Sequence, residues 1–354
     1  MKLIDINTAA PYRVVLGEDL AGSCGTLIQL HAGLSENAKT AVIVTDDNVG
    51  PLYAGTVEEA LTEEGFRVLV YTVPHGEASK NLNTYGKLLG FLADNEVTRT
   101  DFIAALGGGM VGDLAGFAAA TYLRGIRYIQ IPTSLLAAVD SSVGGKTAVD
   151  LPNGKNLAGA FYQPSLVICS PDMLRTLPEE EFTAGCAEVI KYGVLGDEQL
   201  FAHLERFAGD FDREYVISRC IEMKRDIVVQ DEHDLGGRQV LNLGHTLGHA
   251  AEQLSNYSLS HGMAVSVGMA AVAEAAASAG ICSGECAGRI RNVLKRFGLP
   301  VSCEYSMDDL YEVMCRDKKR KGNMISLVIP KRIGACEIRK MSLQEMKSFL
   351  ESAS

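Results

Sequence analysis

The sequence predicts an α/β protein, in which a mostly parallel β-sheet with flanking helices is followed by an α-helical domain. The first observation is that short β-branched runs alternate with helical stretches up to residue 170, which is typical of a parallel sheet covered by helices. The second is that nearly every later segment has helical spacing. We therefore expect two domains, at residues 1–170 and 171–354.

The expected strands of the first domain are apolar runs bounded by turn residues, at 12–16, 41–45, 67–71, 102–106 and 128–132. Between them, helix-forming residues recur at helical spacing over 47–64 and 79–95. In the second domain the same spacing predicts helices at 171–192, 197–206, 214–230, 245–254, 262–279 and 283–297. One short hairpin is expected from 325–329 to 335–338.

The composition is ordinary for a globular protein, with 47% hydrophobic and 22% charged residues. The N-terminus has no signal-peptide pattern, and no uncharged apolar run is long enough to span a membrane. The nine Cys are scattered without a Cys-x-x-Cys pair, which fits a reducing cytoplasm. The net charge of −11 argues against nucleic acid as a partner. We expect a cytoplasmic protein without a membrane or nucleic-acid partner.

Three glycines form a G-x-G-x-x-G turn between an expected strand and a helix, namely Gly107, Gly109 and Gly112. Such a turn lets backbone amides and a helix N-terminus approach a pyrophosphate. It follows about the fourth strand, however, and lacks the later acidic residue of the standard dinucleotide motif. A turn that only packs a helix on a strand is therefore an equal alternative. Polar residues after two other strands, at 45–48 and 76–80, favour a nucleotide site.

A polar, glycine-rich tract follows at 140–156 and contains Lys146 and Lys155. Its segment 144–147 resembles the end of a Walker A motif, but Val139 stands where that motif has its first glycine. The sequence therefore excludes an ATPase of this type. Lysines among glycines still predict an anion site.

Four potential metal ligands recur in the helical half, namely Glu188, His245, His249 and His261. Imidazole and carboxylate are usual zinc ligands, and three protein ligands leave one coordination position for chemistry. For each His alone, a core or capping role is the better explanation, but the group predicts a divalent metal site. His245 and His249 lie one helical turn apart, so spacing alone makes them a ligand pair.

Four long motifs resemble those of the 3-dehydroquinate synthases, a family of sugar phosphate cyclases, and they stand at 107–125, 130–147, 185–193 and 241–249. The resemblance covers nearly the whole chain. It implies a Rossmann-like NAD-binding domain, a helical domain with catalytic zinc or cobalt, and a homodimer.

The resemblance also implies an activity. The expected substrate is a small phosphorylated sugar acid, 3-deoxy-D-arabino-heptulosonate 7-phosphate, and the products are 3-dehydroquinate and phosphate. In this family NAD oxidises a ring hydroxyl, phosphate leaves, the ketone is reduced again, and an intramolecular aldol step closes the carbocycle. NAD is regenerated, so the enzyme is a lyase of the shikimate pathway, which leads to chorismate and the aromatic amino acids.

The family assigns the metal to Glu188, His245 and His261, which differs from the interpretation by spacing. His249 is then left near the substrate for hydrogen bonding or proton relay. Lys191, one turn after Glu188 on the same helix, is expected to reach substrate hydroxyls.

The family also assigns the anion and cofactor contacts. Arg238, with Lys224 nearby, is expected to bind the substrate carboxylate, because a guanidinium fork suits a planar carboxylate. The expected phosphate ligands are Arg124 of the neighbouring subunit, Lys146, Asn156, Asn242, and Lys318 or Lys319. The expected NAD contacts are Asp46, Asn48, Glu77, Lys80, Gly107, Gly108, Gly109, Met110, Asp113, Thr133, Ser134, Asp140, Lys146, Lys155, Met173, Thr176 and Leu177.

The chain departs from the family pattern at Met263, where a Glu is usual, and at Glu180, where an Arg is usual. Neither position is an expected ligand. One alternative is a related cyclase such as 2-deoxy-scyllo-inosose synthase, whose substrate lacks the carboxylate. Others are a metal-dependent polyol or alcohol dehydrogenase, and an inactive binding protein. Phosphate release without net NADH would separate the cyclases from both.

Overall fold

The computed structural model describes residues 1–318 and 324–352, and its contacts divide the chain into two compact units. Unit 1 contains residues 1–177 and 224–233, and unit 2 contains 178–223 and 234–354. The division thus falls twice within or beside helix α7 (Arg213–Gln230). None of the helices in the described part of the chain is long and apolar enough to cross a membrane.

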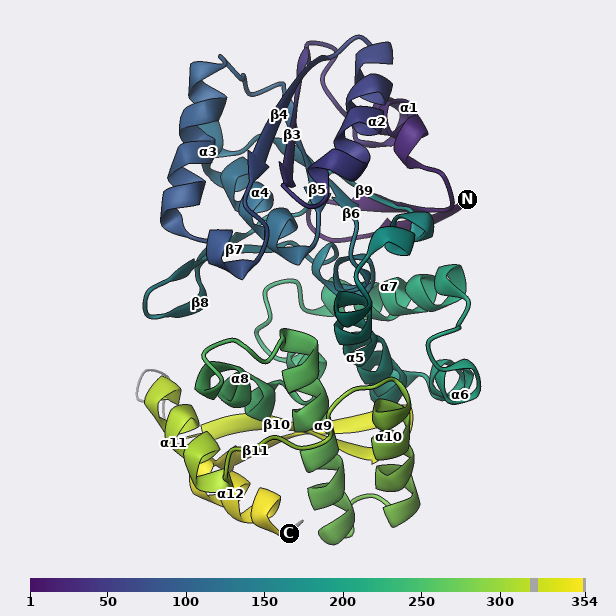
Figure 1. Cartoon of the computed structure of the whole chain (residues 1–354), viewed down its shortest axis with the longest axis vertical. Coiled ribbons are helices and arrows are strands. Elements are labelled where there is room, and N and C mark those ends of the chain that lie inside the picture. The colour runs from purple at the N-terminus through teal and green to yellow at the C-terminus, as the bar shows by residue number, and fades with distance from the viewer. Residues whose placement is uncertain (319–323, 353–354) are drawn as a thin grey trace. The chain divides into compact units, whose positions relative to one another are not determined.

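Unit 1 is built on a seven-stranded sheet with the order β1-β2-β9-β6-β5-β3-β4 (Figure 1). Only the edge strand β1 pairs antiparallel, so the predicted fold class is confirmed. The strands are β1 (Lys2–Ile6), β2 (Tyr12–Leu16), β3 (Thr40–Asp46), β4 (Arg67–Val73), β5 (Phe102–Gly107), β6 (Arg127–Pro132) and β9 (Leu166–Cys169). Strands β1 and β9 were not among the expected strands.

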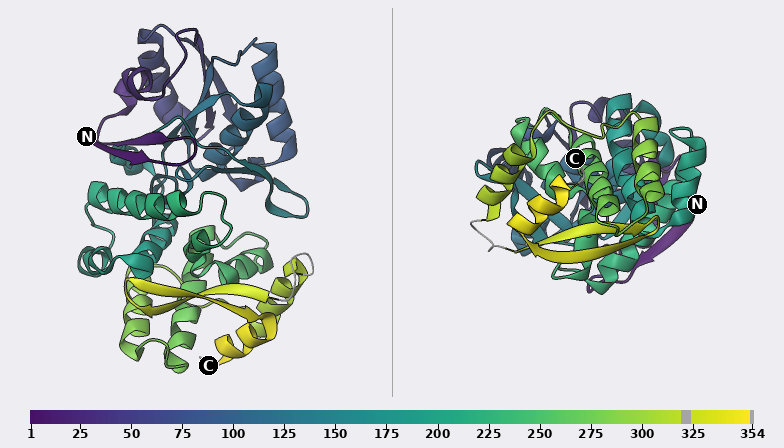
Figure 2. Two further views of the ribbon diagram at one scale, coloured as in Figure 1. Left: turned by 180° about the vertical axis from the view of Figure 1, so that it is seen from behind. Right: turned by 90° about the horizontal axis from the view of Figure 1, so that it is seen from below.

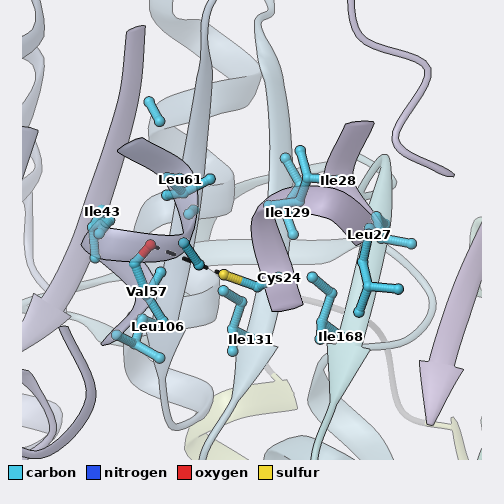
Figure 3. Close-up of a cluster of buried hydrophobic side chains, with 14 of the residues drawn as sticks. Cys24, Leu27, Ile28, Ile43, Val57, Leu61, Leu106, Ile129, Ile131 and Ile168 are labelled. Atoms are coloured by element: carbon cyan, nitrogen blue, oxygen red, sulfur yellow. Dashed lines mark hydrogen bonds between the residues drawn. The ribbon is translucent and has the colours of Figure 1, made fainter. Parts of the chain in front are cut away.

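Helices cover both faces of this sheet, because successive side chains of a strand point to opposite sides. On one face, α1 (Cys24–His31) and α2 (Gly50–Glu63) bury Ile43 of β3. On the other face, α3 (Leu82–Asp94) and α4 (Gly109–Thr121) cover the adjacent residues of β3, Val42 and Val44. Figure 3 shows the first of these two clusters. Strands buried on both faces read as continuous apolar runs, which is why they were predicted.

The polar tract that predicted an anion site folds into an antiparallel hairpin of β7 (Lys146–Leu151) and β8 (Gly154–Phe161). The sequence analysis did not predict these strands. Glycine and lysine weaken the strand pattern, and most side chains of β8 are only partly buried or exposed. Periodicity therefore carries little signal here.

Unit 2 is mainly helical, as predicted, and contains one hairpin that packs against α9 (Figure 2). Besides the first part of α7, its helices are α5 (Glu179–Gly196), α6 (Glu198–Phe207), α8 (His245–Leu254), α9 (His261–Ser278), α10 (Gly284–Arg296), α11 (Met307–Lys318) and α12 (Leu343–Glu351). The hairpin consists of β10 (Met324–Arg332) and β11 (Ala335–Ser342). The expected single helix over 171–192 is wrong. Pro178 interrupts it, so a short 3-10 turn at Pro171–Thr176 precedes α5.

Asp101 connects the starts of strands β3 and β5 by hydrogen bonds. Its Oδ1 accepts hydrogen bonds from the backbone N–H groups of Lys39 (2.9 Å) and Thr40 (2.8 Å). Its Oδ2 accepts from the N–H and the hydroxyl of Thr98, both at 2.7 Å. Burial raises the pKa of Asp101, but these hydrogen bonds outweigh burial and lower it. The ionised carboxylate therefore stabilises the fold above the unfolded-state pKa.

We predict that Asp101→Asn lowers the free energy of unfolding by about 1–3 kcal/mol, because an amide nitrogen faces donors that the carboxylate accepted. Urea unfolding followed by circular dichroism should show a lower midpoint at pH 7. The difference should shrink as the pH falls through the lowered pKa of Asp101. Asp94→Asn, at the exposed end of α3, removes the same charge and serves as the control. Equal midpoints for the two variants would contradict the assignment.

Candidate functional site

Three helices of unit 2 bring the predicted metal ligands together. Helix α5 carries Glu188, α8 begins with His245, and α9 begins with His261. Oε1 of Glu188 lies 3.5 Å from Nε2 of His245 and 3.4 Å from Nε2 of His261. Two ligands of one tetrahedral zinc ion lie roughly 3.3–3.6 Å apart, given bonds of about 2.0–2.2 Å. These separations therefore fit one ion bound by all three side chains.

The environment of Glu188 also fits a cation. Its side chain is fully buried and forms an ion pair with Lys191, yet neither carboxylate oxygen makes a well-formed hydrogen bond with the described residues. Burial raises the pKa of Glu188, but Lys191, His245 and His261 outweigh burial and hold that pKa well below its usual range. An ionised, buried carboxylate with unused lone pairs is costly unless a cation satisfies it.

The two imidazoles are held in different protonation states. Burial lowers the pKa of His245 to about 3, so its Nε2 keeps a free lone pair, while its Nδ1 lies 3.1 Å from the carbonyl oxygen of Leu243. Burial also lowers the pKa of His261, but Glu188 and Glu252 outweigh it and raise this pKa to about 9. A metal ion that binds His261 near neutral pH therefore has to displace a proton.

Glycines beside the ligands allow the three helices to approach closely. A Cβ on Gly262 would lie 1.9 Å from the carbonyl oxygen of Ala184 in α5. A Cβ on Gly248 would lie 2.9 Å from the carbonyl oxygen of Ala264 in α9. Any side chain at either position would push one of these helices away, so the predicted metal site depends on both glycines.

His249 is exposed on α8, and its ring centroid lies 5.3 Å from that of His245 and 5.8 Å from that of His261. The described part of the chain contains two groups of three potential metal ligands, and within each group the ligand atoms lie within 4.8 Å of one another. One is Glu188, His245 and His261, and the other is His249, Glu252 and His261. The first group favours the family's ligand assignment over the one from spacing.

Two of the predicted anion ligands of unit 2, Arg238 and Asn242, lie on a 3-10 turn, Gly237–Asn242, that ends shortly before α8. Arg238 is buried, and Asn242 is exposed. Lys318 ends α11, but its side chain and the whole of Lys319 lie outside the described residues. The choice between these two lysines stays a prediction.

The predicted NAD contacts all lie in unit 1. Most follow the carboxyl ends of the parallel strands β3, β4, β5, β6 and β9, and two lie on the β7–β8 hairpin. The carboxyl edge of a parallel sheet is where such folds bind nucleotides. The glycine turn lies at the same edge, between β5 and α4. A Cβ on Gly112 would lie 2.7 Å from Oε1 of Gln130 in β6, so this glycine serves helix–strand packing.

The buried Lys80 contacts residues that follow several of these strands. Nζ of Lys80 lies 2.6 Å from Oδ2 of Asp113 on α4, 3.6 Å from Oε1 of Glu77, and 2.6 Å from Oδ1 of Asn156 on β8. Burial lowers the pKa of Lys80, but the negative charges of Asp113 and Glu77 outweigh it and raise that pKa. Lys80 is thus a fixed positive charge at the centre of the predicted cofactor site.

Lys224 forms a second fixed cation of unit 1. Its Nζ lies 2.6 Å from Oδ1 of Asp140 and donates a 2.6 Å hydrogen bond to the carbonyl oxygen of the same residue. Arg238 belongs to unit 2, so its predicted pairing with Lys224 stays a prediction. Among the predicted phosphate ligands, Lys146 and Arg124 are exposed, and Arg124 has a positive φ of 68°.

Glu252 is not among the predicted site residues, although it is buried and its Oε2 lies 3.7 Å from Nδ1 of His261. Its spacing offered a signal. On one helix, positions i, i+4 and i+7 share a face, and these are His245, His249 and Glu252.

Comparison with known proteins gives a consistent result. The family model described as 3-dehydroquinate synthase N-terminal matches residues 70–184, and the C-terminal model matches residues 185–320. The chain is 44% identical over 336 residues to the 3-dehydroquinate synthase of Streptococcus suis (strain 05ZYH33), covering 92% of this chain and 95% of the relative.

Two solved structures share the fold. One is 2-deoxy-scyllo-inosose synthase complexed with carbaglucose-6-phosphate, NAD+ and Co2+, with a TM-score of 0.87, 23% identity and coverage of 99% of both chains. The other is the 2-epi-5-epi-valiolone synthase of Streptomyces hygroscopicus subsp. jinggangensis 5008 with NAD+ and Zn2+ bound. Its TM-score is 0.86 at 24% identity, and coverage is 100% of this chain and 98% of that one.

We predict that Glu188→Gln, His245→Ala and His261→Ala each lose the bound divalent ion, because each removes one of three ligands. His249→Ala is the matched control, since it removes an imidazole from the same helix face but should keep the ion while losing rate. Metal analysis of the desalted proteins measures the retained ion, and a turnover assay measures the rate. A His249→Ala protein that loses its ion while His261→Ala retains it would favour the ligand pair from spacing.

Proposed function

The chain belongs to the 3-dehydroquinate synthase family, and we infer that it converts 3-deoxy-D-arabino-heptulosonate 7-phosphate into 3-dehydroquinate and phosphate. The observation that carries this inference is the full-length similarity reported above, which includes both halves of the chain. The enzyme is therefore a lyase, and the shikimate pathway is its metabolic context.

NAD and a zinc or cobalt ion are the cofactors of the proposed enzyme, as in the two structural neighbours. When bound, NAD supplies reversible hydride acceptance and the divalent ion supplies Lewis acidity toward substrate oxygens. Glu188, His245 and His261 are the proposed metal ligands, and their mutual distances support this assignment. The polar residues at the strand ends of unit 1 are the proposed NAD ligands.

The proposed roles of the remaining residues follow from their chemistry. Lys191 is a buried ammonium beside Glu188, so it can donate hydrogen bonds to hydroxyls of a substrate at the metal. His249 is exposed, so its imidazole is available for hydrogen bonding or proton relay to a bound substrate. Lys146, Arg124, Asn156 and Asn242 supply donors for phosphate oxygens. The homodimer and the cytoplasmic location are part of the proposal, and nine free thiols support the latter.

Arg238 is the residue proposed to distinguish this substrate from that of a related cyclase. It is 2% exposed, and a guanidinium so deeply buried is expected to serve a specific anion. The heptulosonate carries a carboxylate, whereas glucose 6-phosphate carries none. A protein with a net charge of −11 has no general attraction for a multiply charged anion, so this attraction has to be local.

We predict that Arg238→Ala lowers kcat/KM on the heptulosonate phosphate roughly ten- to over a hundredfold, since a charged hydrogen-bond partner contributes about 1.5–3 kcal/mol. The wild type should release phosphate without net NADH formation and should not turn over glucose 6-phosphate usefully. Arg206→Ala, an exposed arginine of α6, is the control. Comparable cyclisation of glucose 6-phosphate by the wild type would replace the proposed activity with that of the rival cyclase.

A second prediction concerns the proposed dimer. If Arg124 acts in the partner subunit's site, mixing Arg124→Ala with Glu188→Ala chains should restore activity, because a hybrid dimer has one intact site. Random exchange would restore up to about one quarter of wild-type activity, since half the dimers are hybrids. Mixing Glu188→Ala with His245→Ala is the control, because each substitution damages the site of the chain that carries it and a hybrid dimer has no intact site. No recovery despite demonstrated subunit exchange would place Arg124 in its own chain's site.

A further inference from the structure

The ring of His261 lies between two carboxylates. Its Nε2 is 3.4 Å from Oε1 of Glu188, and its Nδ1 is 3.7 Å from Oε2 of Glu252. The second distance is that of an ion pair, and a shift of under about 1 Å brings it to hydrogen-bond length. The imidazole thus offers one nitrogen to the metal side and the other to Glu252.

Glu252 is well placed to keep this arrangement. It is 4% exposed, and a buried carboxylate is stable only beside hydrogen-bond donors or positive charge. Glu252 lies two turns after His245 on α8, while His261 begins α9. The helix that supplies one metal ligand therefore also supplies a carboxylate to the ligand on the neighbouring helix.

His245 has the same arrangement with a different acceptor. Its Nε2 faces Glu188, and its Nδ1 lies 3.1 Å from the carbonyl oxygen of Leu243. In metal sites, an acceptor on the second ring nitrogen fixes the tautomer, orients the ring and raises the basicity of the ligating nitrogen. The acceptor for His245 is the backbone carbonyl of Leu243, so a substitution of Leu243 does not remove it. The acceptor for His261 is the side chain of Glu252, which a substitution does remove.

We propose that Glu252 is a positioning residue, which accepts a hydrogen bond from Nδ1–H of His261 and so directs Nε2 of His261 to the metal. The proposal rests on the proposed function only in that the ion is held by Glu188, His245 and His261. Loss of such a partner typically weakens metal affinity about 10- to 100-fold.

A different role for Glu252 is conceivable from the geometry alone. His249, Glu252 and His261 have ligand atoms within 4.8 Å of one another, as a second ion would require. His261 would then have to bind two ions, one through each nitrogen, and an imidazole that bridges two ions must lose both ring protons. A single ion with Glu252 as a hydrogen-bond acceptor requires no such deprotonation, so the geometry favours the positioning role.

The test compares purified wild type, Glu252→Gln, Glu252→Ala and Glu214→Gln, which removes an exposed carboxylate from the same unit and serves as the control. Zinc affinity is measured by competition with a chelator, metal content by elemental analysis, and the metal geometry by the visible spectrum of the cobalt-loaded protein. We expect one ion per chain in all four proteins, with 10- to 100-fold weaker affinity and an altered cobalt spectrum for both Glu252 variants. Affinity and spectrum equal to the wild type in Glu252→Ala, which removes the acceptor, would overturn the proposal.

Two further readouts keep the alternatives separate. Two ions per wild-type chain and one in Glu252→Gln would replace the positioning role with a second metal site. In zinc-loaded wild type labelled with ¹⁵N-histidine, NMR should show the proton of His261 on Nδ1, which tests the proposal even if the variants fold poorly. A proton on Nε2 would overturn it. If Glu188→Gln retained the ion as the wild type does, the proposed metal centre itself would be contradicted. That outcome is distinct from a failure of the proposal for Glu252.

Discussion

Burying an ionised carboxylate costs several kcal/mol unless cations surround it, and the fully buried Glu188 imposes this condition on the centre of unit 2. Lys191 from the same helix meets the condition together with the proposed ion, which the imidazoles of His245 on α8 and His261 on α9 would help to hold. They can do so only because α9 lies against α5 and α8 at glycines that have no room for a side chain. Charge compensation and close helix packing are therefore two aspects of one requirement.

Unit 1 meets a different constraint. A parallel sheet brings the carboxyl ends of its strands to one edge, so residues from distant parts of the sequence become neighbours there. The structure places two buried lysines at this edge, and each pairs with a carboxylate, Lys80 with Asp113 and Lys224 with Asp140. These pairs keep cations in fixed positions in a chain that is acidic overall. The proposed cofactor site at this edge would therefore depend on local cations rather than on net charge.

The parts of the structure that follow periodicity were predictable. Central strands such as β5 are continuously apolar because both faces are covered, and α8 has the predicted limits because its apolar spacing is regular. The prediction of one helix over 171–192 was wrong, because Pro178 separates a 3-10 turn from α5. The β7–β8 hairpin was not predicted, because its sequence has no strand-like pattern. Strand β9 has only four residues, and its place in the sheet depends on partners far away in sequence.

The candidate site shows the same limit at the scale of single residues. Ligand-forming residues are recognisable by their type and motif, so Glu188, His245 and His261 could be identified as a group from the sequence alone. For Glu252 the only signal is its spacing from His245 and His249 on α8. Its closeness to Nδ1 of His261 depends on how α8 meets α9, which spacing along either helix does not encode. Met263 illustrates the converse. The family pattern has a carboxylate there, whereas this chain has a thioether, which is only a weak acceptor. The carboxylate that faces Nδ1 of His261 belongs to Glu252 of α8. Support for a metal ligand can thus come from a helix that the ligand's own motif does not include.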